Sequence, residues 1–362
     1  MTTTNCPITG LDHLEFYVGN AKQASVFYSR CFGFNRVAYC GLETGERKKT
    51  SYVLEQGEIR LVISSAFTPD HPINRSVSEH GDTIAIVAFA VSDVDAAYKY
   101  ATERGAVGAI PPTIQEDKNG KLRFAAIRSF GDTLIKFVDR SEYASNFAPG
   151  YTSHNTEYIE PAGLTMVDHV VGNVERGEMD RWVEFFVKTM GFDVRMHFDE
   201  ESISTEYSAL MSKVLDNGNK TIVNINEPAD GLRKSQIQEY LDFHYGAGIQ
   251  HIGLATEDIV QTVIRLREAG VEFLPIPKTY YEDLGDWVKN IDVPLEDLAR
   301  LGILVDRDEN GYLLQLFTKP IGDRPTLFFE IVERRGSRGF GAGNFKSLFV
   351  ALEREQQMRG NL

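Results

Sequence analysis

The sequence lacks the features that would place it among disulfide-rich, membrane or secreted proteins. Its 362 residues hold three cysteines, Cys6, Cys31 and Cys40, without the paired spacing of zinc or disulfide frameworks, so we expect free thiols. No apolar run approaches the roughly 20 residues of a membrane span. The N-terminus has neither the basic start nor the apolar stretch of a secretory signal. We therefore expect a cytoplasmic protein without a membrane partner.

Positive charge is also scarce. The net charge of −14 at pH 7 would repel a phosphate backbone, and the one dense basic stretch, residues 333–338, is too short to form a binding face. Nucleic acid is thereby excluded as a partner. The apolar fraction of 42% and the charged fraction of 25% are ordinary for a globular protein. A prior of roughly 150 residues per domain predicts two or more domains.

The sequence does contain an internal repeat. Residues 11–20 and 167–174 are similar β-prone stretches, and each precedes a helical run that ends at a glycine, Gly33 or Gly191. Residues 84–94 and 249–259 each predict a strand that leads into a helix, and residues 132–140 parallel residues 327–334. We therefore expect an α+β fold of two similar halves, 1–155 and 156–362, in which curled sheets are covered by helices.

The two halves differ at three corresponding strand positions. The second half has His169, His251 and Glu330 there, and the first half has His13, Ile86 and Lys136. Two imidazoles and one carboxylate form the facial triad of non-haem iron(II) oxygenases, which leaves metal positions open for substrate and dioxygen. Ligands this far apart in the sequence can converge only inside a strongly curled sheet. The comparison predicts one metal site, in the second half.

Other interpretations of these residues remain open at this point. A histidine in an apolar strand is more often a hydrogen-bonded core residue than a ligand. A neighbouring arginine, instead of a metal, could balance the buried charge of Glu330. Because their surroundings are polar or irregular, we interpret the following histidines as surface residues: His71, His80, His154, His197 and His244.

Five segments resemble the 4-hydroxyphenylpyruvate dioxygenase family: residues 167–174, 246–252, 311–320, 323–330 and 339–345. The resemblance covers nearly all of the second half and, more weakly, the first. It implies two tandem vicinal-oxygen-chelate (glyoxalase-like) domains of repeated βαβββ modules with curled, open-barrel sheets. It also implies an iron(II)-dependent dioxygenase that converts 4-hydroxyphenylpyruvate and O₂ to homogentisate and CO₂ in tyrosine and phenylalanine catabolism. A homo-oligomer, dimer or tetramer, is expected.

Carried over by position, the resemblance assigns His169, His251 and Glu330 as ligands of Fe(II). It implies catalytic roles for Gln250, Gln315, Phe340 and Asn344, and substrate contacts from Ser212, Asn226, Gln236, Phe317, Phe328 and Phe345. Amide and hydroxyl groups in an apolar cavity suit a phenol that carries a 2-oxo acid. The chain departs from the family at Asn224, where the family usually has proline.

Two other functions compete with this interpretation. A 4-hydroxymandelate synthase uses the same substrate and metal but oxidises the side chain instead of the ring. Asn226 and Phe345 argue against it, because that branch tends to carry aliphatic residues at both positions. A non-catalytic glyoxalase-like binding protein is less favoured because the second half retains all three ligands.

The C-terminal segment predicts a lid. Three glycines within residues 339–343 allow a hinge, and the apolar residues that follow have helical spacing over residues 345–357, with Asn344 as the expected cap. We expect this helix to lie over the metal cavity and to exclude water from it.

Overall fold

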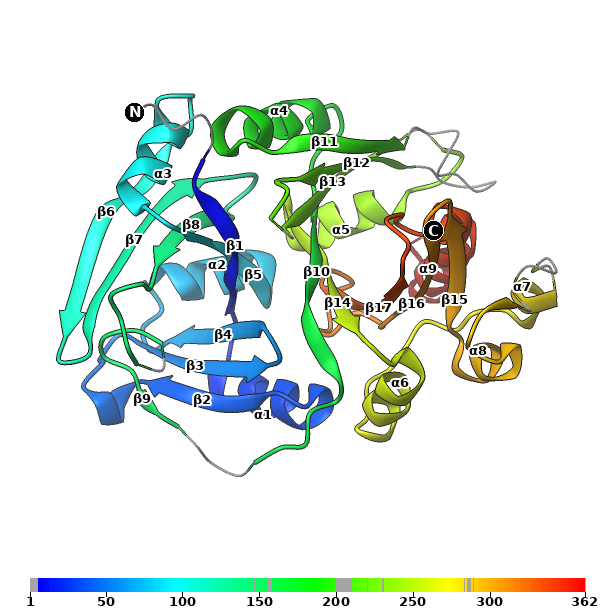
Figure 1. Cartoon of the computed structure of the whole chain (residues 1–362), viewed down its shortest axis with the longest axis horizontal. Coiled ribbons are helices and arrows are strands. Elements are labelled where there is room, and N and C mark those ends of the chain that lie inside the picture. The colour runs from blue at the N-terminus through cyan, green and yellow to red at the C-terminus, as the bar shows by residue number, and fades with distance from the viewer. Residues whose placement is uncertain are drawn as a thin grey trace.

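The computed structural model describes residues 6–145, 147–154, 158–198, 210–219, 221–229, 231–282, 284, 288 and 290–361. Two curled sheets lie side by side, with most helices on their outer surfaces (Figure 1). The expected domain boundary at residue 155 lies outside the described residues and stays a prediction. Among the described residues, no helix has the length and apolar character needed to cross a membrane.

The first sheet belongs to the N-terminal half, and its strand order is β6-β7-β8-β5-β1-β4-β3-β2-β9. Its strands are β1 Ile8–Tyr17, β2 Asn35–Cys40, β3 Lys49–Gln56, β4 Ile59–Ala66, β5 Thr83–Val91, β6 Gly108–Asp117, β7 Gly120–Arg128, β8 Leu134–Asp139 and β9 Thr152–Ser153. Its helices are α1 Ala21–Phe32, α2 Pro72–His80 and α3 Val94–Thr102.

The second sheet belongs to the C-terminal half, and its strand order is β11-β12-β13-β10-β14-β17-β16-β15. Its strands are β10 Leu164–Asn173, β11 Asp193–Phe198, β12 Leu210–Asp216, β13 Ile222–Pro228, β14 Gly248–Thr256, β15 Leu304–Asp308, β16 Gly311–Phe317 and β17 Phe328–Arg335. The helices are α4 Met179–Met190, α5 Gln236–His244, α6 Ile259–Glu268, α7 Lys278–Glu282, α8 Leu295–Leu301 and α9 Phe345–Arg359.

Each half repeats one βαβββ module twice, so the predicted fold class is confirmed. In both halves the first strands of the two modules pair antiparallel at the sheet centre, and each then pairs in parallel with the last strand of its own module. The helices α1 and α4 end where the sequence predicts. Gly33 and Gly191 adopt positive φ angles of 77° and 72° there, which favour glycine.

Strand register confirms which positions correspond between the halves. In the second half the neighbouring pairs are His169–Gly253, Val171–His251 and Gly253–Glu330. In the first half they are His13–Ala88, Glu15–Ile86 and Ala88–Lys136. The residues that replace the three candidate ligands are therefore His13, Ile86 and Lys136, as the repeat predicts.

The interpretation of His80 and His244 as surface residues was wrong. Both are buried where α2 of the first half meets α5 of the second, and their rings stack with centroids 4.4 Å apart. His80 Nδ1 donates to the His244 carbonyl at 2.6 Å, and His244 Nε2 lies 2.9 Å from the Thr83 hydroxyl. Burial, together with the neighbouring His80, lowers the pKa of His244 to about 4. His71 and His154 are partly exposed and His197 is exposed.

Candidate metal centre

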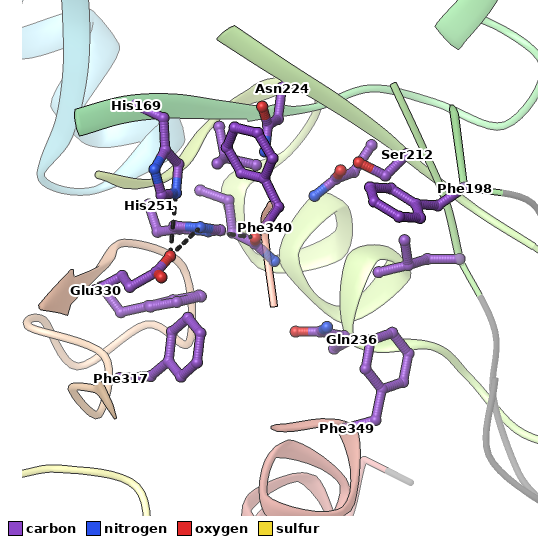
Figure 2. A pocket seen from close by; sticks show the side chains of 15 residues that line it. His169, Phe198, Ser212, Asn224, Gln236, His251, Phe317, Glu330, Phe340 and Phe349 are labelled. Atoms are coloured by element: carbon purple, nitrogen blue, oxygen red, sulfur yellow. Dashed lines mark hydrogen bonds and ion pairs between the residues drawn. The ribbon is translucent and has the colours of Figure 1, made fainter. Parts of the chain in front are cut away.

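Three adjacent strands bring the candidate ligands together. His169 lies on β10, His251 on β14 and Glu330 on β17, and these strands are neighbours in the sheet. Glu330 Oε2 lies 3.0 Å from His169 Nε2 and 3.6 Å from His251 Nε2, and the three ligand atoms all lie within 4.8 Å of one another (Figure 2). All three side chains are largely buried. This spacing suits one metal ion held on one face.

Neighbouring residues orient both imidazoles. His169 Nδ1 donates to the Asp168 carboxylate at 2.7 Å, and His251 Nδ1 donates to the Gln250 amide oxygen at 2.9 Å. Each Nε2 therefore faces Glu330 with its lone pair available to a metal. A hydrogen-bonded second ring nitrogen is typical of metal-binding histidines because it determines the tautomer and the orientation of the ring.

An arginine links this site to the C-terminal segment. Arg334 donates to both oxygens of Asp168, with Nε–Oδ1 at 2.7 Å and Nη2–Oδ2 at 2.8 Å. Its third nitrogen donates to the Gly339 carbonyl at 2.5 Å, and its guanidinium lies over the Phe340 ring. The Phe340 ring in turn meets the His169 ring edge to face, 5.5 Å between centroids. The ligand His169 and the start of the C-terminal segment thus share one hydrogen-bonded network.

The first half contains the same network around His13 but has neither a second histidine nor a carboxylate at the other two candidate ligand positions. His13 Nδ1 donates to Asp12, whose carboxylate accepts two hydrogen bonds from Arg140. Arg140 also donates to the Phe147 carbonyl and lies over the Phe147 ring, which meets the His13 ring at 5.2 Å. In both halves, then, an arginine binds both oxygens of the aspartate that precedes the histidine, and we call this pair the arginine clamp. The clamp is part of the repeated fold, whereas the candidate metal triad belongs to the second half.

Electrostatics in the metal-free site favour a bound cation. Burial opposes the charge on His169, but the negative charges of Glu330 and Asp168 outweigh it and raise the pKa of His169 to about 9. Burial also opposes the charge on Glu330, but the charge of His169 and its hydrogen bond to the carboxylate lower the pKa of Glu330 to about 2. Burial lowers the pKa of His251. The site therefore keeps a buried carboxylate whose charge a divalent metal would neutralise.

The walls around the ligands are tightly packed. The ring of Phe328 stacks on His251 at 4.7 Å. A side chain at Gly253 would bring its Cβ to 2.3 Å from His169 Cε1, so the His169 ring occupies the space above this glycine. The His169 ring can take this position because residue 253 is a glycine.

A cavity opens from the candidate metal site. Apart from the three candidate ligands it is lined by Val171, Phe198, Leu210, Ser212, Asn224, Asn226, Gln236, Gln250, Phe317, Phe328, Phe340 and Phe349. Figure 2 shows the ligands on one side and Ser212, Phe198 and Gln236 on the other, with Asn224 and Phe340 between them. The cavity is thus apolar with a few buried polar groups, as small-molecule sites usually are.

Most of the predicted site residues lie in this cavity, but Gln315 and Asn344 do not line it. Gln315 is buried beneath Gly341 and does not line the cavity. Asn344 precedes α9 but makes no capping hydrogen bond, so that expectation was wrong; its side-chain oxygen accepts from the Tyr280 hydroxyl at 2.7 Å. The side chain of Phe345 lies outside the described part of the chain.

Besides Asn224, which the sequence marked only as a departure from the family, four lining residues were not among the predicted site residues: Val171, Phe198, Leu210 and Phe349. Strand alternation could have found Val171, which is two residues beyond His169 on the same face of β10. Phe198 and Phe349 reach the cavity only because β11 and α9 pack beside it.

Comparisons with known proteins agree with this geometry. Residues 10–134 and 166–316 match the model of the Glyoxalase/Bleomycin resistance protein/Dioxygenase superfamily. The chain is 44% identical to the 4-hydroxyphenylpyruvate dioxygenase of Aspergillus fumigatus, over 98% of this chain and 94% of that protein. It is 45% identical to the Danio rerio enzyme of the same name, over 97% and 91%. Among solved structures, a variant of 4-hydroxymandelate synthase from Streptomyces coelicolor matches with a TM-score of 0.87 and 33% identity, over 97% of this chain and 99% of that chain.

Proposed function

The chain belongs to the 4-hydroxyphenylpyruvate dioxygenase family, and on that premise we propose that it converts 4-hydroxyphenylpyruvate and O₂ to homogentisate and CO₂. The observation that carries the proposal is the convergence of His169, His251 and Glu330 on one point at the end of a cavity. The first half, which has the same fold and the same arginine clamp, lacks two of these three ligands.

The metal in this proposal is iron(II). The donor set fits it, since two imidazole nitrogens and one carboxylate oxygen with open positions suit non-haem iron(II). Iron bound there would chelate the 2-oxo acid of the substrate and activate O₂. Asp168 and Gln250 hold the two imidazoles with their Nε2 atoms toward the metal.

The remaining cavity residues bind and orient the aromatic ring. Phe317 and Phe340 supply apolar walls near the candidate ligands, and Phe328 stacks on His251. Ser212 supplies a polar group at the far side, where Asn226 is its neighbour across the strands. A substrate whose oxo acid binds the metal would direct its phenolic hydroxyl toward that far side. The aromatic walls also keep water away from the reacting atoms, which protects an oxidising centre from side reactions. Gln315 supports the Gly341 turn from beneath in this proposal.

The C-terminal helix α9 serves as the lid. Phe349 of this helix lines the cavity, and Arg359 near its end donates to Glu239 of α5 with Nη2–Oε2 at 2.8 Å. The segment that leads into α9 turns at Gly341, whose φ of 71° favours glycine. A cytoplasmic location and assembly into a dimer or tetramer stay predictions from the sequence and its resemblance.

Anaerobic reconstitution tests the function. The protein should bind about one iron(II) per chain, as a single facial triad requires, and on addition of substrate and O₂ it should release homogentisate. Chromatography against authentic standards identifies the product; predominant 4-hydroxymandelate would instead place the chain in the rival branch. Glu330→Ala should abolish turnover, and His13→Ala, the matched change in the first half, should leave the iron content unchanged.

A further inference from the structure

The polar side of the cavity carries more hydrogen-bonding capacity than one hydroxyl can use. Among the described residues, the side chains of Ser212, Asn224, Asn226 and Gln236 make no hydrogen bond, although all four line the cavity. Asn224 stands out because its amide oxygen is fully buried and has no partner. A buried amide without a partner costs free energy, so a ligand group is expected to satisfy it.

Strand register places Asn224 closer to the candidate metal ligand His169 than Asn226 or Ser212. On β13, Asn224 pairs with Val171 of β10, and Asn226 pairs with Asn173. At about 3.3 Å per residue, Asn224 therefore lies roughly 7 Å along the strand from His169, and Asn226 roughly 13 Å. Ser212 of β12 pairs with Asn226, so it belongs to the farther level.

This order decides which part of a substrate meets Asn224. A ring whose oxo acid binds the metal and whose para hydroxyl reaches Ser212 and Asn226 has its edge beside Asn224. The para hydroxyl itself offers one donor and two acceptor sites, which Ser212 and Asn226 can already occupy. The Asn224 amide is left for a group on the edge of the ring.

We propose that Asn224 is a specificity-determining residue that binds a second ring hydroxyl next to the phenol, so that the enzyme also takes catechol-type 2-oxo acids such as 3,4-dihydroxyphenylpyruvate. This deepens the proposed function and rests on it. The reaction stays balanced: one O₂ is consumed, one oxygen atom enters the new carboxylate and one the ring, and CO₂ leaves, giving a trihydroxyphenylacetate.

The test compares kcat/KM for 3,4-dihydroxyphenylpyruvate and 4-hydroxyphenylpyruvate in the iron-loaded protein and its variants. Asn224→Leu, which keeps the size but removes the amide, should lower the ratio of the two constants about tenfold, the effect of one lost hydrogen bond of ordinary strength. Asn224→Val serves as a second variant. Asn226→Leu is the matched control, and it should weaken both substrates without the same change in ratio.

Binding supplies a readout that does not depend on turnover. Anaerobic calorimetry on iron-loaded protein should show the same loss of preference for the catechol oxo acid in Asn224→Leu. The proposal is overturned if both Asn224 variants keep the wild-type ratio, or if the wild-type protein does not turn over the catechol substrate. It is also overturned if 3,4-dihydroxyphenylacetate, which lacks the oxo acid, binds as tightly as 3,4-dihydroxyphenylpyruvate, because the catechol would then be chelating iron. If 4-hydroxyphenylpyruvate gives no homogentisate, the proposed function fails instead, and calorimetry still tests Asn224.

Discussion

The arginine clamp occurs in both halves, so the same substitution can be made beside the candidate metal site and far from it. Arg334→Gln removes two hydrogen bonds, of 2.7 and 2.8 Å, from Asp168, and Arg140→Gln removes two, of 2.7 and 2.9 Å, from Asp12. Each change leaves a largely buried carboxylate without its bidentate partner. Burial raises the pKa of Asp168, but the hydrogen bonds from Arg334 and His169 and the charges of these residues outweigh it and hold that pKa well below its usual value.

The two variants should lose similar folding stability. Breaking a fully buried ion pair costs about 3–5 kcal/mol. Because the arginine side chains are 22% and 21% exposed, we expect a smaller loss, about 2–3 kcal/mol, in each. Arg60 lies 3.7 Å from Asp12 and partly compensates in the first half, so Arg140→Gln should lose slightly less. Urea unfolding, followed by two probes that must give the same transition, measures both losses.

Only Arg334→Gln should weaken the metal site. Asp168 orients the ligand His169, and loss of such an outer partner typically lowers metal affinity about 10- to 100-fold. Competition with a chelator for iron(II) or cobalt(II) gives the affinity of each folded variant. Equal loss of affinity in both variants would mean that the effect comes through overall stability. Unchanged affinity in folded Arg334→Gln would refute a role of the clamp in positioning the ligand.

Three further changes have defined outcomes. Deleting the chain from Gly339 onward should leave the metal site largely formed but uncouple O₂ consumption from homogentisate release; a folded, iron-loaded truncation with full coupling would rule out the lid. Gly253→Ala should displace the His169 ring, because the new Cβ would lie 2.3 Å from His169 Cε1. The variant should still fold, since the first half has Ala88 at the matching position opposite His13, but its metal affinity should fall. Unchanged affinity in chelator competition would contradict this. For His244, the folded-state pKa of about 4 lies below the ordinary 6.5, so the unfolded chain takes up the proton first as pH falls. Its contribution to stability is therefore complete above about pH 6.5 and is lost towards pH 4, with about 2 kcal/mol lost between pH 7.5 and pH 5. In urea unfolding, the free energy of unfolding of His244→Gln should therefore fall by about 2 kcal/mol less than that of the wild type between pH 7.5 and pH 5. An identical pH dependence in the variant and the wild type would show that His244 does not titrate this way.

The candidate ligands could be found in the sequence because the repeat supplied an internal comparison. Side-chain direction alternates along a strand, so a residue's position within the repeated module determines which face it occupies. Aligning the two copies therefore identified His251 and Glu330 as the residues that have replaced, or been replaced by, Ile86 and Lys136. Strand register in the structure gives the same correspondence.

Other features depend on contacts between segments that no local pattern links. His80 and His244 have polar neighbours in the sequence, but each is buried by a helix from the other half. The pairing of Arg334 with Asp168 joins residues on β17 and β10, and nothing in either segment alone predicts it. Asn344 stands where a cap is expected, yet its side chain bonds to Tyr280, because α7 brings that hydroxyl within reach.

The sequence by itself predicted an α+β fold of two similar halves, the half that carries the candidate metal ligands and the helical C-terminal segment, because periodicity and glycine positions act within short stretches of chain. Only the tertiary structure decided that Asn224 lies between the candidate metal site and the far polar groups, and that its buried amide oxygen has no partner. The physical reason is that burial and hydrogen-bond satisfaction depend on which strands become neighbours and in what register, and these are properties of the folded sheet as a whole.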